Sequence, residues 1–445
     1  MPNPERRMAP ALCLAIIRCA VLSLCLTLLL RVFLLDTYHV PTGSMAPALL
    51  GNHRACTCPR CGHPIQVGLH PRDPADGDAD PRCYRFAACP NCGATGLPLH
   101  QAPVVAGQRL LVNKTAFAAR SPRRWEIVVF HLFGVDFIKR LLGLPGEAVE
   151  IRDGDLYIDG RLCRKTLDEF KAMRISVFDN NRQPEPMTWA ARWEQAPYRP
   201  DFQPLQGTSL HLDAADAWHL VAYRHFDIDT RKCLPILDEY AYNGAEPHRL
   251  VAVHDLMLEC DLEIQEGQGT LALGITDGHD HLLARLPLTG SRATLHRITA
   301  FSLPALDDAG LPLAEASGVS LLAGKRYHVE WALVDRRLTL RLDGVDVFPP
   351  LDLAPCRERR PLVRPVVLAA KDARATVSNI RLWRDVHYTQ AGTNGVAGAV
   401  VRLGPQQYFV LGDNSARSED SRYWPAGGAV SASSLLGTPL WPARP

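Results

Sequence analysis

The stretch "DFIKRLLGLPGEAVEIRDGDLYIDG" (residues 136–160) carries the clearest fold signal in the sequence. Apolar and polar residues alternate on both sides of Asp153-Gly154, a dipeptide that favours two-residue hairpin turns. The segments 107–117 and 123–135 are typical of further strands. This region therefore predicts a compact β domain, and we expect the whole protein to be mainly β.

The composition is that of a multidomain globular protein. The chain has 445 residues, 47% of them hydrophobic, and a formal net charge of +2. Such a length allows more than one buried core, so two or three domains are expected. The near-zero net charge and the lack of an arginine-rich run argue against nucleic acid as a partner.

An apolar segment lies near the N-terminus, where residues 9–35 are apolar apart from Arg18, Arg31 and a few small polar residues. A membrane-spanning helix needs roughly 20 such residues, and either arginine can extend its charged end to an interface. A cleaved secretory signal is the alternative, but no Ala-x-Ala site follows the apolar run. We expect residues 1–35 to be a cytoplasmic N-terminus and a transmembrane anchor.

The orientation of this anchor follows from its flanking charges. Arg6 and Arg7 precede the apolar segment, and positive residues favour the cytoplasmic side. We therefore expect a single pass through the cytoplasmic (inner) membrane, with membrane lipid around the anchor. Everything from about Asp36 onward would lie on the extracytoplasmic face.

Six of the 13 cysteines lie in "CTCPRCGHP" (56–64) and "CYRFAACPNCGATG" (83–96). Each stretch contains Cys-Pro-x-Cys-Gly, a knuckle that presents two thiolates to a tetrahedral zinc ion. The predicted ligands of a structural zinc are Cys58, Cys61, Cys89 and Cys92. A pair of disulfides is the alternative, because thiols outside the cytoplasm tend to oxidise. Cys56 and Cys83 are left over as a disulfide or as alternative ligands.

Residues 206–388 contain many short strands of alternating apolar and polar residues, with turn signals such as Asp343-Gly344. Regular short strands of this kind suggest a β-sandwich. The pattern resembles the laminin-G or concanavalin-like jelly roll, whose members often bind glycans. A structural insert or a protein-contact module fits the pattern equally well. We expect an independent insert that can be removed without loss of the catalytic core.

A serine stands on a tight turn in "VPTGSMAPALL" (residues 40–50), just after the predicted anchor. A serine hydroxyl is a poor nucleophile at neutral pH unless a base removes its proton, and local spacing suggests no Ser-His-Asp set. A lysine can be that base if burial keeps it neutral. Lys139 has the apolar neighbours Phe137 and Leu141, although such a lysine on its own is more often a surface residue with a packed stem.

Four blocks, in chain order, resemble the bacterial type I signal peptidase family. They are residues 40–50, "GQRLLVNKTAF" (107–117), residues 137–160 and "LGDNSARSEDSRYWP" (411–425). The resemblance implies a β-rich catalytic core on the outer surface of the membrane. It also implies a serine endopeptidase that cuts N-terminal signal peptides from exported preproteins by a Ser-Lys dyad, with no cofactor for catalysis.

The resemblance assigns the reacting groups position by position. Ser44 matches the nucleophile and Lys139 the general base. The Ser44 backbone N–H and the Thr42 hydroxyl would form the oxyanion hole, in which family members often carry serine instead of threonine. Ser418 matches the residue that hydrogen-bonds the lysine amine, and the residues that match a supporting ion pair are Asp420 and Arg422.

The family's substrate pocket falls on apolar positions of this chain. They are Val40, Met45, Leu49, Phe137 and Ile138. A shallow apolar pocket fits small side chains and so an Ala-x-Ala cleavage preference. The departures from the family pattern are Arg417, Pro425, Gln108 and Phe137, which stand where asparagine, glycine, aspartate and tyrosine are usual. None of them removes a dyad atom, so we expect altered loop geometry rather than lost activity.

The predicted architecture is a signal-peptidase-type β core interrupted by a zinc ribbon and by a jelly-roll sandwich. In chain order the parts are the N-terminus and anchor (1–35), the core with the serine (36–55), the ribbon (56–100), the core with the lysine (101–160), a linker with the helical segment "TLDEFKAM" (161–205), the sandwich (206–388) and the last part of the core (389–445).

Two other functions compete with this interpretation. A self-cleaving repressor-type protease shares the Ser-Lys core, but it would need a DNA-binding module and no anchor. A catalytically inactive cell-envelope protein would use the ribbon and the sandwich to bind a glycan or a protein partner. The presence of Ser44, Lys139 and Ser418 in one chain argues against the inactive protein.

Overall fold

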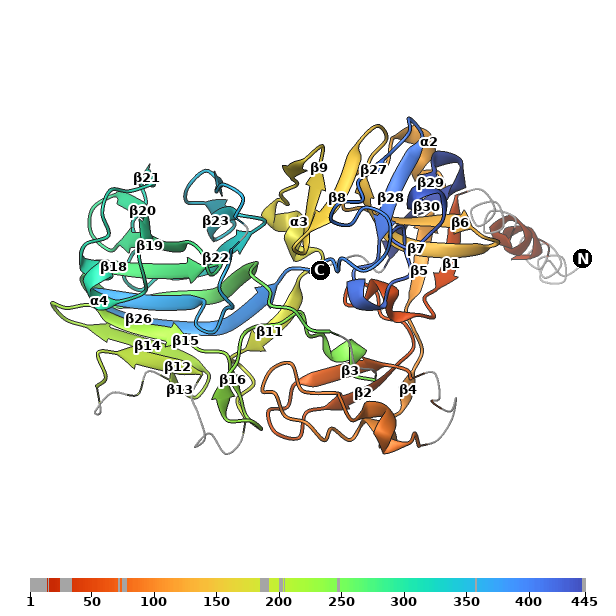
Figure 1. Cartoon of the computed structure of the whole chain (residues 1–445). Helices are drawn as coiled ribbons and strands as arrows, with labels where there is room; N and C mark the ends of the chain where they lie inside the picture. The colour runs from red at the N-terminus through yellow and green to blue at the C-terminus, as the bar shows by residue number, and fades with distance from the viewer. Residues whose placement is uncertain are drawn as a thin grey trace, which may run out of the picture.

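The computed structural model describes residues 14, 16–24, 34–70, 73, 78–184, 192–199, 203, 205–245, 249–356 and 358–441. As predicted, β-strands dominate these residues. Figure 1 shows a large sandwich, a second group of sheets toward the N-terminus, which we call the core, and a small three-stranded sheet beside both.

The core contains a seven-stranded and a four-stranded antiparallel sheet. Strands from before and after the sandwich pair in both sheets, so the chain leaves the core and returns to it. Across the larger sheet the order is β1 (Leu35–His39), β5 (Arg109–Asn113), β30 (Leu435–Trp441), β6 (Ile127–Leu132), β7 (Val135–Gly143), β28 (Gln407–Leu411) and β29 (Val430–Ser431). Across the smaller sheet it is β10 (Arg161–Leu162), β9 (Asp155–Ile158), β8 (Ala148–Arg152) and β27 (Val401–Arg402).

The hairpin predicted at Asp153-Gly154 is present between β8 and β9. Val149 pairs with Ile158 across it, and the two turn residues have positive φ angles of 50° and 90°. Positive φ at both central residues matches the twist of paired strands, which explains why this dipeptide stands here. Val149 and Ile151 are fully buried, as the alternating pattern requires.

A fully buried ion pair joins two strands of the core. Arg140, on β7, donates to both carboxylate oxygens of Asp413, which follows β28, and to the carbonyl oxygen of Trp125 at 2.6 Å. Neither charged side chain is exposed to solvent. Because a buried charge is tolerated only when it is paired and hydrogen-bonded, this pair holds the loop after β28 against β7.

The small sheet carries the cysteine-rich segment, and we call residues 52–105 the cysteine ribbon. Its strand order is β3 (Pro64–Gly68), β2 (His53–Thr57) and β4 (Val104–Val105). The 3-10 turns η2 (Pro81–Tyr84) and η3 (Leu99–Gln101) complete it. Its apolar cluster includes Ile228 and Ala241 from the second insert, so the ribbon packs against that insert as well as the core.

The sandwich encloses the largest apolar cluster of the described residues. The predicted inner residues Trp331, Leu340 and Ile380 all lie in this cluster and are buried. Its strands are β13 (Leu205–Gln206), β14 (Ser209–Ala214), β15 (His219–Tyr223), β18 (Leu256–Thr276), β19 (His281–Pro287), β20 (Arg292–Ile298), β21 (Ala314–Ser317), β22 (Arg326–Val334), β23 (Arg337–Leu342), β24 (Val345–Asp346), β25 (Leu351–Asp352) and β26 (Val366–Arg384), together with two strands described next. The short elements elsewhere are α2 (Ala116–Ala119), β16 (Phe226–Asp227), β17 (Lys232–Cys233), α4 (Leu303–Asp307), η7 (Ala426–Gly428) and η8 (Ala432–Ser434).

Part of the segment 161–205 belongs to the sandwich rather than to a linker. The predicted helical stretch forms α3 (Leu167–Lys171), which Thr166 and Glu169 cap by reciprocal hydrogen bonds. After it, β11 (Ile175–Asp179) pairs with β26, and β12 (Trp193–Ala196) pairs with β15. These strands cover edges that would otherwise be open, so the sheet begins nearer residue 175 than residue 206.

Buried charges join the sandwich to the core. Lys165 contacts Asp335 at 2.9 Å and Asp385 at 2.8 Å. Arg359 contacts Asp155 of β9 at 3.3 Å. All five side chains are at least nine-tenths buried, so the two parts share an interior rather than a flexible tether.

The N-terminal segment is described only in part. Residues 14 and 16–24 are helical and lie at the end of the molecule opposite the sandwich (Figure 1). The rest of the predicted anchor, residues 1–13, 15 and 25–33, lies outside the described residues. Among the residues that are described, no helix has the length and apolar character needed to cross a membrane. The transmembrane helix therefore stays a prediction.

Replacing Arg140 by methionine should strongly destabilise the core. The change leaves the Asp413 carboxylate buried without its partner, which typically lowers the free energy of unfolding by about 3–5 kcal/mol. Urea unfolding followed by tryptophan fluorescence measures this loss, because the Arg140 side chain contacts Trp125. Arg374→Met is the matched control, since Arg374 is half exposed where it pairs with Glu266, and exposed pairs contribute about 0–1 kcal/mol. Equal losses in the two variants would contradict the role given to the buried pair.

Candidate active site

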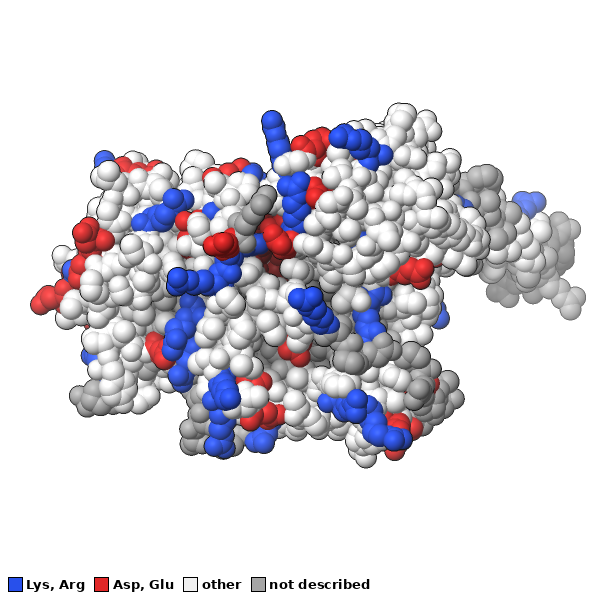
Figure 2. All heavy atoms as spheres, in the orientation of Figure 1, with Lys and Arg blue, Asp and Glu red and all other residues white. Residues whose placement is uncertain are grey.

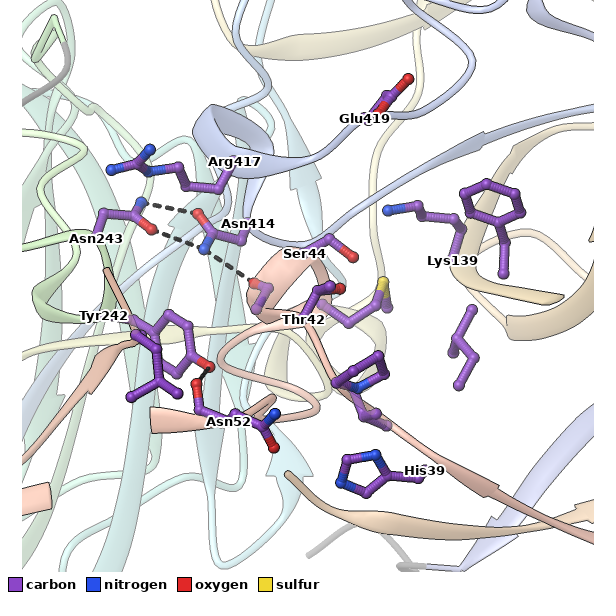
Figure 3. A pocket seen from close by; sticks show the side chains of 18 of the residues that line it. His39, Thr42, Ser44, Asn52, Lys139, Tyr242, Asn243, Asn414, Arg417 and Glu419 are labelled. Atoms are coloured by element: carbon purple, nitrogen blue, oxygen red, sulfur yellow. Dashed lines mark hydrogen bonds between the residues drawn. The ribbon is translucent and has the colours of Figure 1, made fainter. Parts of the chain in front are cut away.

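A cleft of about 800 Å³ lies where the core, the cysteine ribbon and the sandwich insert meet. Its lining includes Ser44 and Lys139 of the core, Asn52 of the ribbon and Tyr242 of the insert. Figure 3 shows Ser44 and Thr42 in the middle of the cleft, with Lys139 on one side and Tyr242 on the other. The fold thus places the predicted nucleophile and base on one cavity.

The turn that carries Ser44 is held from outside by the loop after β28. Thr42 is extended and borders the cleft, and the chain then tightens into the 3-10 turn η1 (Gly43–Met45). Ser44 is half-buried, and its backbone carbonyl accepts a hydrogen bond from the backbone N–H of Asn414 at 3.0 Å. The Asn414 side-chain amide donates to the Gly43 carbonyl, also at 3.0 Å. This pair of bonds fixes the turn on which the hydroxyl stands.

Lys139 is a buried lysine on β7, with 3% of its surface exposed. Its Nζ donates a hydrogen bond to Oγ of Ser418 at 3.0 Å. Burial lowers the pKa of Lys139 to about 8, Asp420 opposes this shift, and Arg422 adds to it. At pH 7 an amine with such a pKa is neutral in roughly one molecule in ten, which is enough to act as a base.

The predicted ion pair lies beneath Ser418. Arg422 donates to each oxygen of Asp420 at 2.9 Å, and both side chains are fully buried. Arg422 also donates to the Ser415 carbonyl at 2.8 Å, on the 3-10 turn η6 (Ser415–Arg417). The guanidinium thus closes the loop that presents the Ser418 hydroxyl to Lys139.

Three residues that shape this site were not identified from the sequence. A Cβ at Gly412 would lie 2.3 Å from both the Ser418 Oγ and the Ser44 carbonyl oxygen, so only glycine lets the two loops approach. Arg140 and Asp413 form the buried pair beside them. The available signal was adjacency, because Arg140 follows Lys139 and the other two lie in the block that also contains Ser418.

Four of the five predicted pocket residues line the cleft. They are Val40, Met45, Phe137 and Ile138. Leu49 does not line it and is instead buried in the apolar cluster behind it. The reason is the η1 turn, after which the chain folds back into the core. Phe137 is half core and half cleft, because its ring also packs on Trp424 with centroids 5.2 Å apart.

The departures from the family pattern are accommodated by local contacts. The Gln108 side-chain oxygen accepts the Leu50 N–H at 2.9 Å. Arg417 lines the cleft, and Pro425 precedes the turn η7. None of these residues displaces Lys139 from Ser418.

One wall of the cleft comes from the sandwich insert, which the sequence did not predict. Tyr242 and Asn243 lie on the 3-10 turn η5 (Ala241–Asn243) and line the cavity. No motif marks them, since their position depends on how the insert packs against the core. Removing residues 206–388 would therefore remove this wall as well as the sandwich.

The four predicted metal ligands are gathered in the cysteine ribbon. Cys58, Cys61, Cys89 and Cys92 are buried, and their sulfurs all lie within 4.8 Å of one another. The pairs Cys58–Cys92 and Cys61–Cys89 are 3.7 and 3.6 Å apart. Sulfurs about 2.3 Å from a tetrahedral zinc lie about 3.8 Å apart, so the set fits that ion. Cys56 and Cys83 lie outside this group.

Part of the chain is similar to known proteins. The model of the family described as "Signal peptidase, peptidase S26" matches residues 100–208 and 364–442, which include Lys139 and Ser418 but not Ser44. Signal peptidase I of Rickettsia massiliae is 27% identical over 149 residues, 33% of this chain and 43% of that protein. Signal peptidase I T of Bacillus subtilis is 40% identical over 57 residues, 12% of this chain and 30% of that protein. The chain thus spans less than half the length of these relatives.

Solved structures of a carbohydrate-binding module and a galectin also align with part of the chain. A carbohydrate-binding module of Bacillus subtilis is 16% identical, with 38% of this chain and 82% of that chain covered and a TM-score of 0.23. A galectin of Caenorhabditis elegans is 11% identical, with 30% and 82% covered and a TM-score of 0.21.

The Lys139 amine should titrate near pH 8, well below the roughly 10.4 of an exposed lysine, because burial disfavours the ammonium form. NMR titration of the full chain labelled with carbon-13 in its lysine side chains measures this, and the Lys139→Arg variant identifies the signal by its loss. A midpoint above pH 10 would contradict the buried environment described here.

Proposed function

We infer that this protein is a serine endopeptidase that cleaves signal peptides from exported preproteins. The premise is that its core matches the signal peptidase (peptidase S26) family. The observation that carries this proposal is the buried Lys139 amine, bonded to Ser418 and facing the cleft that contains Ser44. A catalytically inactive binding protein is not favoured, because it would have no need for a buried lysine of lowered pKa.

The proposed reaction uses Ser44 and Lys139 as a dyad. The Ser44 Oγ attacks the scissile carbonyl carbon, and neutral Lys139 takes the proton from the Ser44 hydroxyl as it does so. The Ser44 N–H and the Thr42 hydroxyl stabilise the oxyanion, and protonated Lys139 returns the proton to the leaving amine as the C–N bond breaks. Water then hydrolyses the acyl ester, again with Lys139 as the base. Ser418 orients the Lys139 amine and takes no part in bond formation.

The apolar half of the cleft would bind the end of the signal peptide. Val40, Met45 and Ile138 leave a shallow apolar surface beside Ser44. Small side chains fit such a surface, which supports an Ala-x-Ala preference on the N-terminal side of the cleaved bond.

Membrane anchoring through the N-terminal segment is part of this proposal. The described helical residues leave half or more of their apolar surface exposed, namely Leu14, Ile16, Ile17, Val21, Leu22 and Leu24. An exposed apolar surface of this kind suits a lipid environment. Figure 2 shows few charged side chains on the neighbouring surface of the core. The proposed arrangement is a single pass through the cytoplasmic membrane, with the N-terminus inside and the cleft outside.

The two inserts are proposed to have binding roles of different kinds. The cysteine ribbon would hold one zinc ion, which has a structural role because four thiolates leave no position for water. The sandwich, taken from about residue 175 to 388, would bind a glycan or a protein partner of the cell envelope.

Cleavage of a preprotein by the detergent-solubilised protein tests the dyad. Ser44→Ala and Lys139→Arg should each lower the rate at least about 10³-fold, because arginine keeps its charge and cannot act as a base. With the wild-type protein the rate should rise about tenfold per pH unit below pH 8 and level off above it, as Lys139 loses its proton. Appreciable turnover by the arginine variant, or a rate that is flat across this range, would refute Lys139 as the base.

Metal analysis of the purified protein tests the ribbon. One zinc per chain is expected, and Cys58→Ala with Cys89→Ala should abolish its retention, because two of the four ligands are lost. Replacing Cys56 and Cys83 instead should leave the metal content unchanged. A chain that holds no metal and has the four thiols oxidised would make the ribbon a disulfide module.

A further inference from the structure

We propose that the half of the cleft built by the two inserts is a subsite for the residues that follow the scissile bond. This inference rests on the proposed peptidase function and adds a specificity that depends on residues outside the protease core. The wall is formed by Asn52, Gly68, Leu69 and His70 from the ribbon and by Tyr242, Asn243 and Ala245 from the sandwich insert.

Tyr242 is wedged between the nucleophile turn and the ribbon. A Cβ on Gly43 would lie 2.0 Å from the Tyr242 ring, and a Cβ on Gly68 would lie 2.6 Å from it. Its hydroxyl donates to the Asn52 carbonyl at 3.1 Å. Because both contact positions are glycines, there is room for the aromatic ring. The ring comes from a segment about 200 positions away from Ser44 in the sequence. Side chains at these glycines would exclude the ring.

Asn243 connects the insert to the reacting serine. Its side-chain amide exchanges two hydrogen bonds of 2.8 Å with the amide of Asn414, and both residues are buried. The Asn414 side chain in turn donates to the Gly43 carbonyl (Figure 3), and its backbone N–H donates to the Ser44 carbonyl. The insert therefore positions the nucleophile turn as well as forming a wall.

The chemistry of the two halves assigns their occupants. On the Lys139 side of Ser44, Phe137 and Ile138 of β7 line the cleft next to the amine, and Ile138 packs in one apolar cluster with Val40 and Met45. On the other side the lining includes the amides of Asn52 and Asn243, the Tyr242 phenol and the Arg417 guanidinium. A substrate that places its small apolar residues on the Lys139 side passes over Ser44 at the cleaved bond. The residues after that bond must then lie on the Tyr242 side, which is the second half of the cleft. The second half then receives the start of the mature protein, where the amide, phenol and guanidinium groups suit a peptide backbone and polar side chains.

Two sets of preproteins that differ in single positions test this subsite. One set varies the two residues after the cleavage site among Ala, Gln, Asp and Trp, and the other varies the two alanines of Ala-x-Ala before it. Relative kcat/KM values are measured for wild type, Tyr242→Ala, Tyr242→Phe and Ala245→Leu. Binding of the same peptides to the same variants in a Ser44→Ala background is measured by fluorescence anisotropy.

The expected result is a change of about tenfold in the selectivity of Tyr242→Ala for residues after the bond, with selectivity before the bond unchanged. Ala245→Leu should lower kcat/KM for the substrates with tryptophan after the cleaved bond, because the larger side chain narrows the cleft. This variant provides a second measure if Tyr242→Ala folds poorly. Tyr242→Phe keeps the ring and should keep the wild-type selectivity. An Ile138→Ala variant should show the reverse pattern.

The outcomes separate the subsite from the peptidase function. If wild type cleaves preproteins but Tyr242→Ala and Ala245→Leu leave selectivity after the bond unchanged, the subsite is wrong and the function stands. If wild type cleaves nothing but the Ser44→Ala protein binds peptides with a preference that Tyr242→Ala removes, the subsite stands and the catalytic proposal fails. Absence of both cleavage and selective binding overturns both.

Discussion

The candidate active site depends on keeping one amine out of water. Lys139 lies on β7, opposite Val128 of β6 and in contact with the loop after β28, and its burial is the largest influence on its pKa. A buried amine needs a hydrogen-bond partner that does not stabilise its charge strongly, and the neutral hydroxyl of Ser418 meets that need. A carboxylate in the same place would favour the ammonium form. The nearby charge of Asp420 is largely balanced because Arg422 bonds both of its oxygens.

The loop after β28 transmits this constraint to the rest of the core. It begins at Gly412, continues through Asp413 and Asn414, and ends at the Asp420–Arg422 pair. Its residues contact the Ser44 turn, Arg140 beside the lysine, and the lysine itself through Ser418. The proposed nucleophile and base lie on different elements of the core, and this one loop bonds to both of them.

The inserts are part of the same arrangement. The sandwich shares a buried charge network with β9, and its turn η5 bonds the Asn414 side chain. The cysteine ribbon also packs on the insert, where the Ile228 N–H donates to the Cys92 carbonyl at 3.2 Å. Ordering the ribbon by a metal and docking the sandwich would therefore both act on the wall of the cleft. An insert attached by two flexible connections would have no such effect.

What the sequence determined by itself was local. Strand alternation, the Asp153-Gly154 turn, the capping residues of α3 and the paired Cys-Pro-x-Cys-Gly knuckles depend on contacts between near neighbours, so a short stretch is enough to predict them. The candidate dyad was also predictable, because its residues stand in short blocks that resemble a known family.

Tertiary structure alone decided the rest. β11 and β12 joined the sandwich because distant strands offered open edges. Leu49 does not line the cleft, because the chain after η1 folds back and buries this side chain in the apolar cluster. Tyr242 and Asn243 reached the cleft because two glycines and one asparagine, all far from them in sequence, left a space and a partner of the right shape. Such contacts depend on the packing of whole domains, and no local pattern encodes them.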